Sequence, residues 1–99
     1  MDYQLIWTEE ALADLDEITL YWTEMVSAAR ADKFVEMIYK KFDLLLTMPY
    51  IGVKSSKRAM VRRLIIDKRY SLAYVVVVVD EIYLLRLFDN RQNPAKYEF

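Results

Sequence analysis

The sequence predicts an α+β fold in which a short N-terminal strand and an αα-hairpin pack on a mainly antiparallel sheet of about four strands. Two helical stretches with apolar stripes occupy most of the first half. Three runs rich in valine, isoleucine, leucine and tyrosine follow between residues 61 and 88, separated by Asp67-Lys68 and Asp80-Glu81. A chain of this length supports one core, so we expect a single domain over residues 1–99.

The central strand is expected at residues 70–79, with a neighbouring strand on each edge. Its side chains alternate between two faces. One face carries Tyr70, Leu72, Tyr74, Val76 and Val78, and the other carries Ser71, Ala73, Val75, Val77 and Val79. Since both faces are apolar, each needs a cover. The helices supply one cover, and the second face is expected to be open for a partner.

The first helix is expected after a short strand at Tyr3–Trp7, with Thr8 as its N-cap and with Glu9 and Glu10 in its first turn. Its apolar stripe is predicted at Leu12, Leu15, Ile18, Trp22 and Met25. The acidic residues of this helix, including Asp14, are interpreted as a solvated face.

The second helix is expected from Ala28 to about Thr47, with Ser27 as its N-cap and with Pro49 and Gly52 forming a turn after it. Its stripe is predicted at Phe34, Ile38, Lys41 or Phe42, Leu45 and Met48. With almost no linker between them, the two helices form a hairpin that buries both stripes against the sheet.

The composition excludes several kinds of chemistry. The chain has no cysteine and no histidine, so cysteine-ligated metal sites and Ser-His or Cys-His nucleophiles are excluded. Its single glycine excludes a glycine-rich phosphate loop. We therefore expect no metal and no cofactor. The longest uncharged apolar run, Leu72–Val79, is too short for a membrane span, and no secretion signal is evident, so a cytoplasmic protein is expected.

Charge is distributed unevenly along the chain. Residues 1–53 carry ten acidic and four basic residues, a net charge of −6, while residues 54–99 carry five and ten, a net charge of +5. The basic residues gather in a segment expected to be a loop that leads into the first strand of the meander: Lys54, Lys57, Arg58, Arg62 and Arg63. This asymmetry predicts a face for a polyanion or an acidic partner, and a chance distribution of solvated charges is the alternative.

Four stretches in this order resemble the RelE/ParE superfamily of small bacterial toxins, which includes plasmid stabilisation proteins. They are LIWTEEALADLDEITLYW, MPYIG, RRLIIDKRYSLAYVV and LLRLFDNRQNPAKY. The resemblance covers nearly the whole chain and implies the toxin of a type II toxin–antitoxin pair. The RelE branch cleaves messenger RNA on the ribosome, whereas the ParE branch poisons DNA gyrase.

The resemblance implies catalytic roles for Arg62, Arg91 and Tyr97. It also implies nucleic-acid binding by the other basic residues of the loop, which are Lys54, Lys57, Arg58 and Arg63. Ser71 stands where relatives usually carry a catalytic arginine, and Asp89 replaces a histidine that many of them have. These two differences weaken the case for RNA cleavage.

The predicted function is therefore growth inhibition, with metal-independent, ribosome-dependent cleavage of messenger RNA placed slightly ahead of gyrase poisoning. A third hypothesis is a toxin that has lost its chemistry and acts as an antitoxin-binding co-repressor. The expected partners are a cognate antitoxin and the ribosome with its messenger RNA, or gyrase in the alternative. Self-association into a homodimer through the open apolar face is a further possibility.

Overall fold

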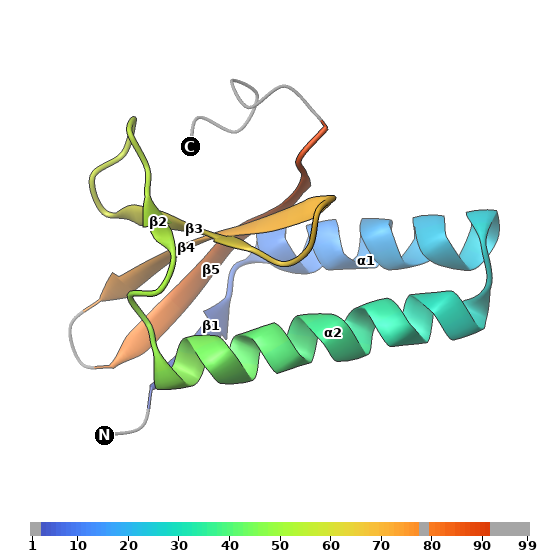
Figure 1. Cartoon of the computed structure of the whole chain (residues 1–99), viewed down its shortest axis with the longest axis horizontal. Coiled ribbons are helices and arrows are strands. Elements are labelled where there is room, and N and C mark those ends of the chain that lie inside the picture. Colours follow the sequence, from blue (N-terminus) through green and yellow to red (C-terminus); the bar gives the residue numbers. More distant parts are fainter. Residues whose placement is uncertain (1–2, 78–79, 92–99) are drawn as a thin grey trace.

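The computed structural model of this protein describes residues 3–77 and 80–91. The elements, in chain order, are β1 (Gln4–Trp7), α1 (Glu9–Met25), α2 (Ala28–Thr47), β2 (Val53–Lys54), β3 (Val61–Ile65), β4 (Tyr70–Val77) and β5 (Glu81–Asp89). The two helices run antiparallel to each other and lie on one side of the sheet (Figure 1). The predicted α+β fold, with its helical hairpin and mainly antiparallel sheet, is confirmed.

The sheet has five strands in the order β1-β5-β4-β3-β2. β4 lies between β3 and β5 and is antiparallel to both, as predicted for the central strand. The N-terminal strand β1 pairs in parallel with the first half of β5. The strand that sequence reasoning missed is β2, whose two residues pair with Arg62 and Arg63 at the edge of β3. Two residues carry no readable alternation, so such a strand becomes visible only through its pairing.

Both helix starts follow the predicted capping chemistry. The Thr8 hydroxyl accepts the backbone N–H of Ala11, and the Ser27 hydroxyl accepts that of Arg30. Each cap satisfies one of the backbone donors that the first turn of a helix leaves without an intrahelical partner. The hairpin therefore has its connection at Val26 and Ser27, where it was predicted.

The core lies between the hairpin and one face of the sheet. Its buried helical residues are Ala11, Ala31, Phe34, Ile38, Phe42 and Leu45, and its strand residues include Leu64, Tyr70, Leu72, Tyr74, Ile82, Leu84 and Leu87. The Phe34 ring lies between the rings of Trp22 and Tyr70, with centroid separations of 6.2 and 4.9 Å. The Trp22 indole also donates a hydrogen bond of 3.1 Å to the Tyr70 hydroxyl, so aromatic contacts tie both helices to β4.

The predicted helix stripes are wrong at their ends. Leu12 and Met25 in α1, and Met48 after α2, are exposed by 46%, 68% and 45%. The buried side of α1 instead runs through Ala11, Leu15, Ile18 and Trp22, with Asp14 beside it. Neighbouring stripes of a helix share their central residues, and only the surface packed against the helix decides which one is buried.

The centre of the second face of the sheet is buried, contrary to the expectation of an open face. Val61, Ala73 and Phe88 are buried there and form a small cluster with Val75 and Leu85. Large exposed apolar side chains lie at other places, including the end of α1 and the α2–β2 connection. Among the described helices, none is both long and apolar enough to cross a lipid bilayer.

Helix α1 continues the edge of the sheet where β1 stops. β1 pairs only with Glu81–Leu84, and the register then shifts because β5 has an extra residue at Leu85. The Thr8 hydroxyl donates a 2.7 Å hydrogen bond to the carbonyl of Leu84. One turn and a half later, Asp14 accepts the backbone N–H of Leu87 at 3.0 Å. Side chains at the start of α1 thus form hydrogen bonds with backbone groups of β5 that β1 does not reach.

Asp14 also forms a two-point ion pair with Arg86, at 2.7 Å to Nε and 3.0 Å to Nη2. Its side chain is only 11% exposed. The interpretation of Asp14 as part of a solvated acidic face is therefore wrong. A carboxylate can be buried here because a guanidinium fork and a backbone N–H satisfy its two oxygens.

We expect Asp14→Ala to lower the free energy of unfolding by about 3 kcal/mol, because it removes the carboxylate that pairs with Arg86 and accepts the Leu87 N–H. Urea unfolding followed by circular dichroism would measure this loss. The matched control is Asp16→Ala, an exposed acid of the same helix, for which the change should stay within about 0.5 kcal/mol. Equal losses for the two variants would show that the ion pair does not hold α1 to β5.

Candidate functional site

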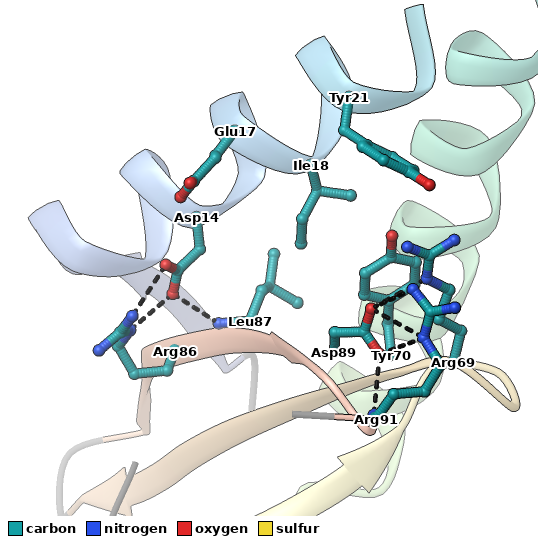
Figure 2. Close-up of a pocket in the computed structure, with 10 residues that line it drawn as sticks. All are labelled: Asp14, Glu17, Ile18, Tyr21, Arg69, Tyr70, Arg86, Leu87, Asp89 and Arg91. Atoms are coloured by element: carbon teal, nitrogen blue, oxygen red, sulfur yellow. Dashed lines mark hydrogen bonds and ion pairs between the residues drawn. The ribbon is translucent and has the colours of Figure 1, made fainter. Parts of the chain in front are cut away.

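A pocket of about 320 Å³ opens between α1 and the adjoining ends of β4 and β5 (Figure 2). Its apolar surface comes from Ile18, Tyr70 and Leu87. Its charged lining consists of Asp14, Glu17, Arg69, Arg86, Asp89 and Arg91. The pocket forms here because α1 lies against the edge of β5, so the chain segments at the end of the sheet face the middle of the helix.

Asp89, the last residue of β5, accepts hydrogen bonds from two arginines. Arg69 approaches through Nε at 3.0 Å, and Arg91 through Nη2 at 3.0 Å and through its backbone N–H at 2.8 Å. Partial burial raises the pKa of the Asp89 carboxyl, but the hydrogen bonds from Arg91 and Arg69 outweigh it. Together they lower this pKa from 3.8 to about 2. Asp89 is thus ionised at any physiological pH.

Arg69 is held in place by aromatic rings as well as by Asp89. Its guanidinium carbon lies 4.9 Å from the ring centre of Tyr21 and 5.2 Å from that of Tyr70. A hydrogen bond from Arg69, and then its charge, lower the pKa of the Tyr21 phenol. The Asp67 carboxylate accepts the backbone N–H groups of Arg69 and Tyr70 at 2.7 and 2.8 Å, which fixes the turn that presents Arg69 to the pocket.

Ser71 is fully buried on β4, next to Tyr70 in sequence but on the opposite face of the sheet, together with Ala73. Its hydroxyl donates a 2.5 Å hydrogen bond to the side-chain carbonyl of Asn90. The position at which relatives usually carry an arginine is therefore occupied by a neutral side chain with an internal partner. It supplies no cation to a bound phosphate.

Arg62 holds the turn that follows α2. Its Nη1 donates to the carbonyl oxygens of Gly52 at 2.8 Å and Tyr50 at 3.1 Å, and its guanidinium lies 5.1 Å from the centre of the Tyr50 ring. The Tyr74 hydroxyl completes this turn by accepting the Gly52 N–H and donating to the carbonyl of Pro49, both at 2.8 Å. The Arg62 guanidinium thus makes structural contacts within the chain.

The predicted catalytic residues do not converge within the described ranges. Arg62 pairs with Tyr74 on β4, whereas the last pair between β4 and β5 joins Tyr70 and Asp89, and Arg91 lies beyond it. Four residues along a strand correspond to about 13 Å. Tyr97, the third predicted residue, lies outside the part of the chain that the structure describes. The catalytic roles assigned to these residues remain predictions.

The predicted nucleic-acid-binding residues are all exposed and lie at the opposite edge of the sheet. Lys54 belongs to β2, and Arg63 points from β3 away from the helices, next to Arg62 in sequence but on the other face. Lys57 and Arg58 lie in the β2–β3 connection, where the Ser55 hydroxyl accepts both of their backbone N–H groups at 3.1 Å. Lys54 and Arg63 also line a small hollow of about 180 Å³.

Sequence reasoning did not single out Asp14, Arg69 or Arg86, although all three line the larger pocket. Asp14 could have been noticed because it precedes Ile18 by four residues and Tyr21 by seven, the spacing of one helix face. Arg69 and Arg86 were not identified: Arg69 directly precedes β4, where charged residues are common, and Arg86 is a single charge within β5. Among residues 3–77 and 80–91, no group of three or more carboxylate, histidine or cysteine side chains is arranged to hold a metal ion.

Arg62→Ala should lower the free energy of unfolding by about 1–2 kcal/mol, because the carbonyl groups of Gly52 and Tyr50 lose a charged donor. Thermal and urea unfolding would measure the change. Arg30→Ala serves as the matched control, since Arg30 is an exposed arginine in the first turn of α2. If Arg62→Ala is as stable as this control, then Arg62 does not hold the turn.

Stability should fall as the pH drops from 4 to 2. The folded-state pKa of Asp89 lies below its unfolded value of 3.8, so its contribution is complete above that value and disappears as the carboxyl is protonated near pH 2. Because the pocket is open to solvent, we expect about 1 kcal/mol from this group. Urea unfolding of wild type and Asp89→Asn across this range would test it, and parallel curves for both proteins would contradict the prediction.

Comparison with known proteins places the chain in a family. A family model described as the ParE toxin of the type II toxin–antitoxin system parDE matches residues 5–94. A chain in the structure of a chromosomal ParDE system from P. aeruginosa is similar, with a TM-score of 0.74 and 28% identity over 88% of this chain and 95% of that one.

A YoeB/ParE toxin from Agrobacterium tumefaciens has a TM-score of 0.63 and 15% identity, over 88% of this chain and 98% of that one. At that identity the likeness concerns the fold alone. A search of curated proteins gave no significant match. Since the family model spans nearly the whole chain, this protein belongs to the ParE toxin family of type II toxin–antitoxin systems.

Proposed function

We propose that this toxin inhibits bacterial growth by binding DNA gyrase, and that it does not cleave messenger RNA. Its role as the toxin of a toxin–antitoxin pair, with an antitoxin as its partner, follows from the family. The resemblance to the ParE branch suggests gyrase as the target. Action on gyrase would take place in the cytoplasm.

The observation that carries this proposal is the internal use of the arginines expected to act on RNA. Cleavage by a neighbouring 2′-hydroxyl without a metal requires cations placed around one phosphate. Arg91 is paired with Asp89, and Arg62 is bound to backbone carbonyls about four residues away along the sheet. Within the described chain, Arg62 and Arg91 are held at positions about 13 Å apart along the sheet, so in this arrangement their guanidinium groups do not meet at one phosphate.

The exposed apolar surface also fits a toxin that acts by binding a protein. Leu20, Met25 and Val26 are exposed by 57%, 68% and 51% near the turn of the hairpin. Such side chains are suited to the core of a protein interface. Glu17 and Glu24 are exposed on the same helix, within one turn of Leu20 and Met25, and they would repel a nucleic-acid backbone.

Ribosome-dependent RNA cleavage, which the sequence placed slightly ahead, is the second candidate. The exposed basic residues in and beside the β2–β3 connection favour it, because Lys57, Arg58 and Arg63 could contact ribosomal or messenger RNA. They would bind the backbone, whereas the chemistry would still need a cation cluster. A toxin that has lost its activity and acts with its antitoxin as a co-repressor is the third.

The purified toxin should inhibit DNA supercoiling by gyrase, and cells expressing it should stop growing with induced DNA-damage signalling and intact transcripts. Supercoiling assays, a damage-response reporter and primer extension on translated messages would measure these effects. Cuts within translated codons, together with unaffected gyrase, would refute the proposal in favour of RNA cleavage. A folded toxin that affects neither gyrase nor messages would also refute it and leave the co-repressor role.

A further inference from the structure

We propose that the pocket between α1 and the end of β5 receives one acidic side chain of the antitoxin, whose carboxylate binds between Arg91 and Arg69. The inference rests on the toxin's role in a toxin–antitoxin pair as proposed above, but it does not depend on whether the toxin's target is gyrase. It names a binding position, its ligand chemistry and the residues that recognise it.

The first argument is a charge imbalance at one end of the pocket. Arg69 and Arg91 carry two positive charges and share a single carboxylate, that of Asp89. The other arginine, Arg86, has its own carboxylate in Asp14. One more carboxylate would balance the Arg69–Asp89–Arg91 group and form two arginine–carboxylate pairs.

The second argument is the direction of the remaining donors. A guanidinium has five N–H groups, and Asp89 takes up only the Nε and Nη2 side of Arg91. In the part of the chain that the structure describes, Asp89 is the only hydrogen-bonding partner of the Arg91 side chain, which is 67% exposed. Figure 2 shows the two guanidinium groups at the same end of the pocket, with the Tyr21 hydroxyl directed toward them.

The third argument is the shape and apolar surface of the site. A volume of about 320 Å³ exceeds what a carboxylate alone needs, so the stem of an Asp or Glu side chain can also enter. Ile18, Leu87 and the Tyr70 ring offer apolar contacts to that stem. Next to such an apolar surface, water competes less for the arginine pair than it would on an open surface. The pair therefore binds a carboxylate more strongly there.

The remaining charges of the pocket favour a single carboxylate over a nucleic acid. Glu17 is exposed on α1, and Figure 2 places it at the Asp14 end of the pocket, away from Arg91. Residues 1–53, which include α1, carry a net charge of −6. One carboxylate can approach Arg91 without coming close to Glu17, whereas a strand of phosphates would extend along the acidic helix.

A double-mutant cycle would test this proposal, with the antitoxin that is recovered in complex with this toxin. Each Asp and Glu of the antitoxin is changed to Asn or Gln, and its binding is measured against wild-type toxin, Arg91→Gln and the control Arg30→Gln. Arg91→Gln should weaken binding about tenfold, and one antitoxin carboxylate should lose its effect in that background only. Glu17→Gln should bind the antitoxin as tightly as wild type or more tightly, since it removes a like charge.

The proposal is overturned if Arg91→Gln binds the antitoxin like wild type, or if no antitoxin acid couples to Arg91 more than to Arg30. A loss of gyrase inhibition in Arg91→Gln with unchanged antitoxin binding would also overturn it and assign the pocket to the target. The coupling between Arg91 and an antitoxin carboxylate is measured separately from gyrase inhibition. A wild-type toxin that shows this coupling but does not inhibit gyrase would therefore refute only the gyrase proposal. Arg91 is largely exposed, so the fold should tolerate its replacement, and circular dichroism would verify this.

Discussion

The contact on which the rest of the structure depends is that between Asp14 and the edge of β5. β1 covers only the first half of this edge, and Asp14 takes over at Leu87 while it holds Arg86 in a two-point ion pair. This contact fixes where α1 lies and so which of its residues face the sheet. The pocket exists because α1 is held beside β5, past the point where a strand would have continued. A buried carboxylate thus sets both the packing and the position of the candidate site.

The charged residues at the two edges of the sheet differ in how they are paired. At the α1 end, arginines and carboxylates are closely paired, and the pairing lowers the pKa of Asp89 to about 2. At the β2 and β3 edge, the basic residues are exposed, and Arg62 is the one that holds the turn after α2. The Arg62 guanidinium is a weaker ligand for a phosphate, since its hydrogen bonds to the carbonyls of Tyr50 and Gly52 compete with that role. The distribution of partners therefore argues for recognition of proteins over chemistry on RNA.

The apolar surface that is exposed for partners is not the open sheet face that the sequence predicts. At the centre of the second face Val61, Ala73 and Phe88 are buried, while apolar side chains at the end of α1 and after α2 are exposed. An antitoxin that engages this toxin would meet apolar surface on the helices and paired charges in the pocket. Apolar contacts would supply most of the affinity, and the arginines would select an acidic residue at one place.

The fold class, both helix caps and the central strand follow from the sequence alone, because they depend on local chemistry and periodicity. The family resemblance follows from four stretches of sequence in their order. Thr8 and Ser27 cap the helices as their side chains predict, and Tyr70–Val77 pairs on both edges as its composition predicts. The burial of Asp14, the support of a turn by Arg62 and the meeting of Arg69 and Arg91 at Asp89 are results of tertiary packing. The contacts Arg62–Gly52, Arg69–Asp89 and Asp14–Arg86 join residues 10, 20 and 72 positions apart, and which charged group meets which partner depends on how the helix and strands pack.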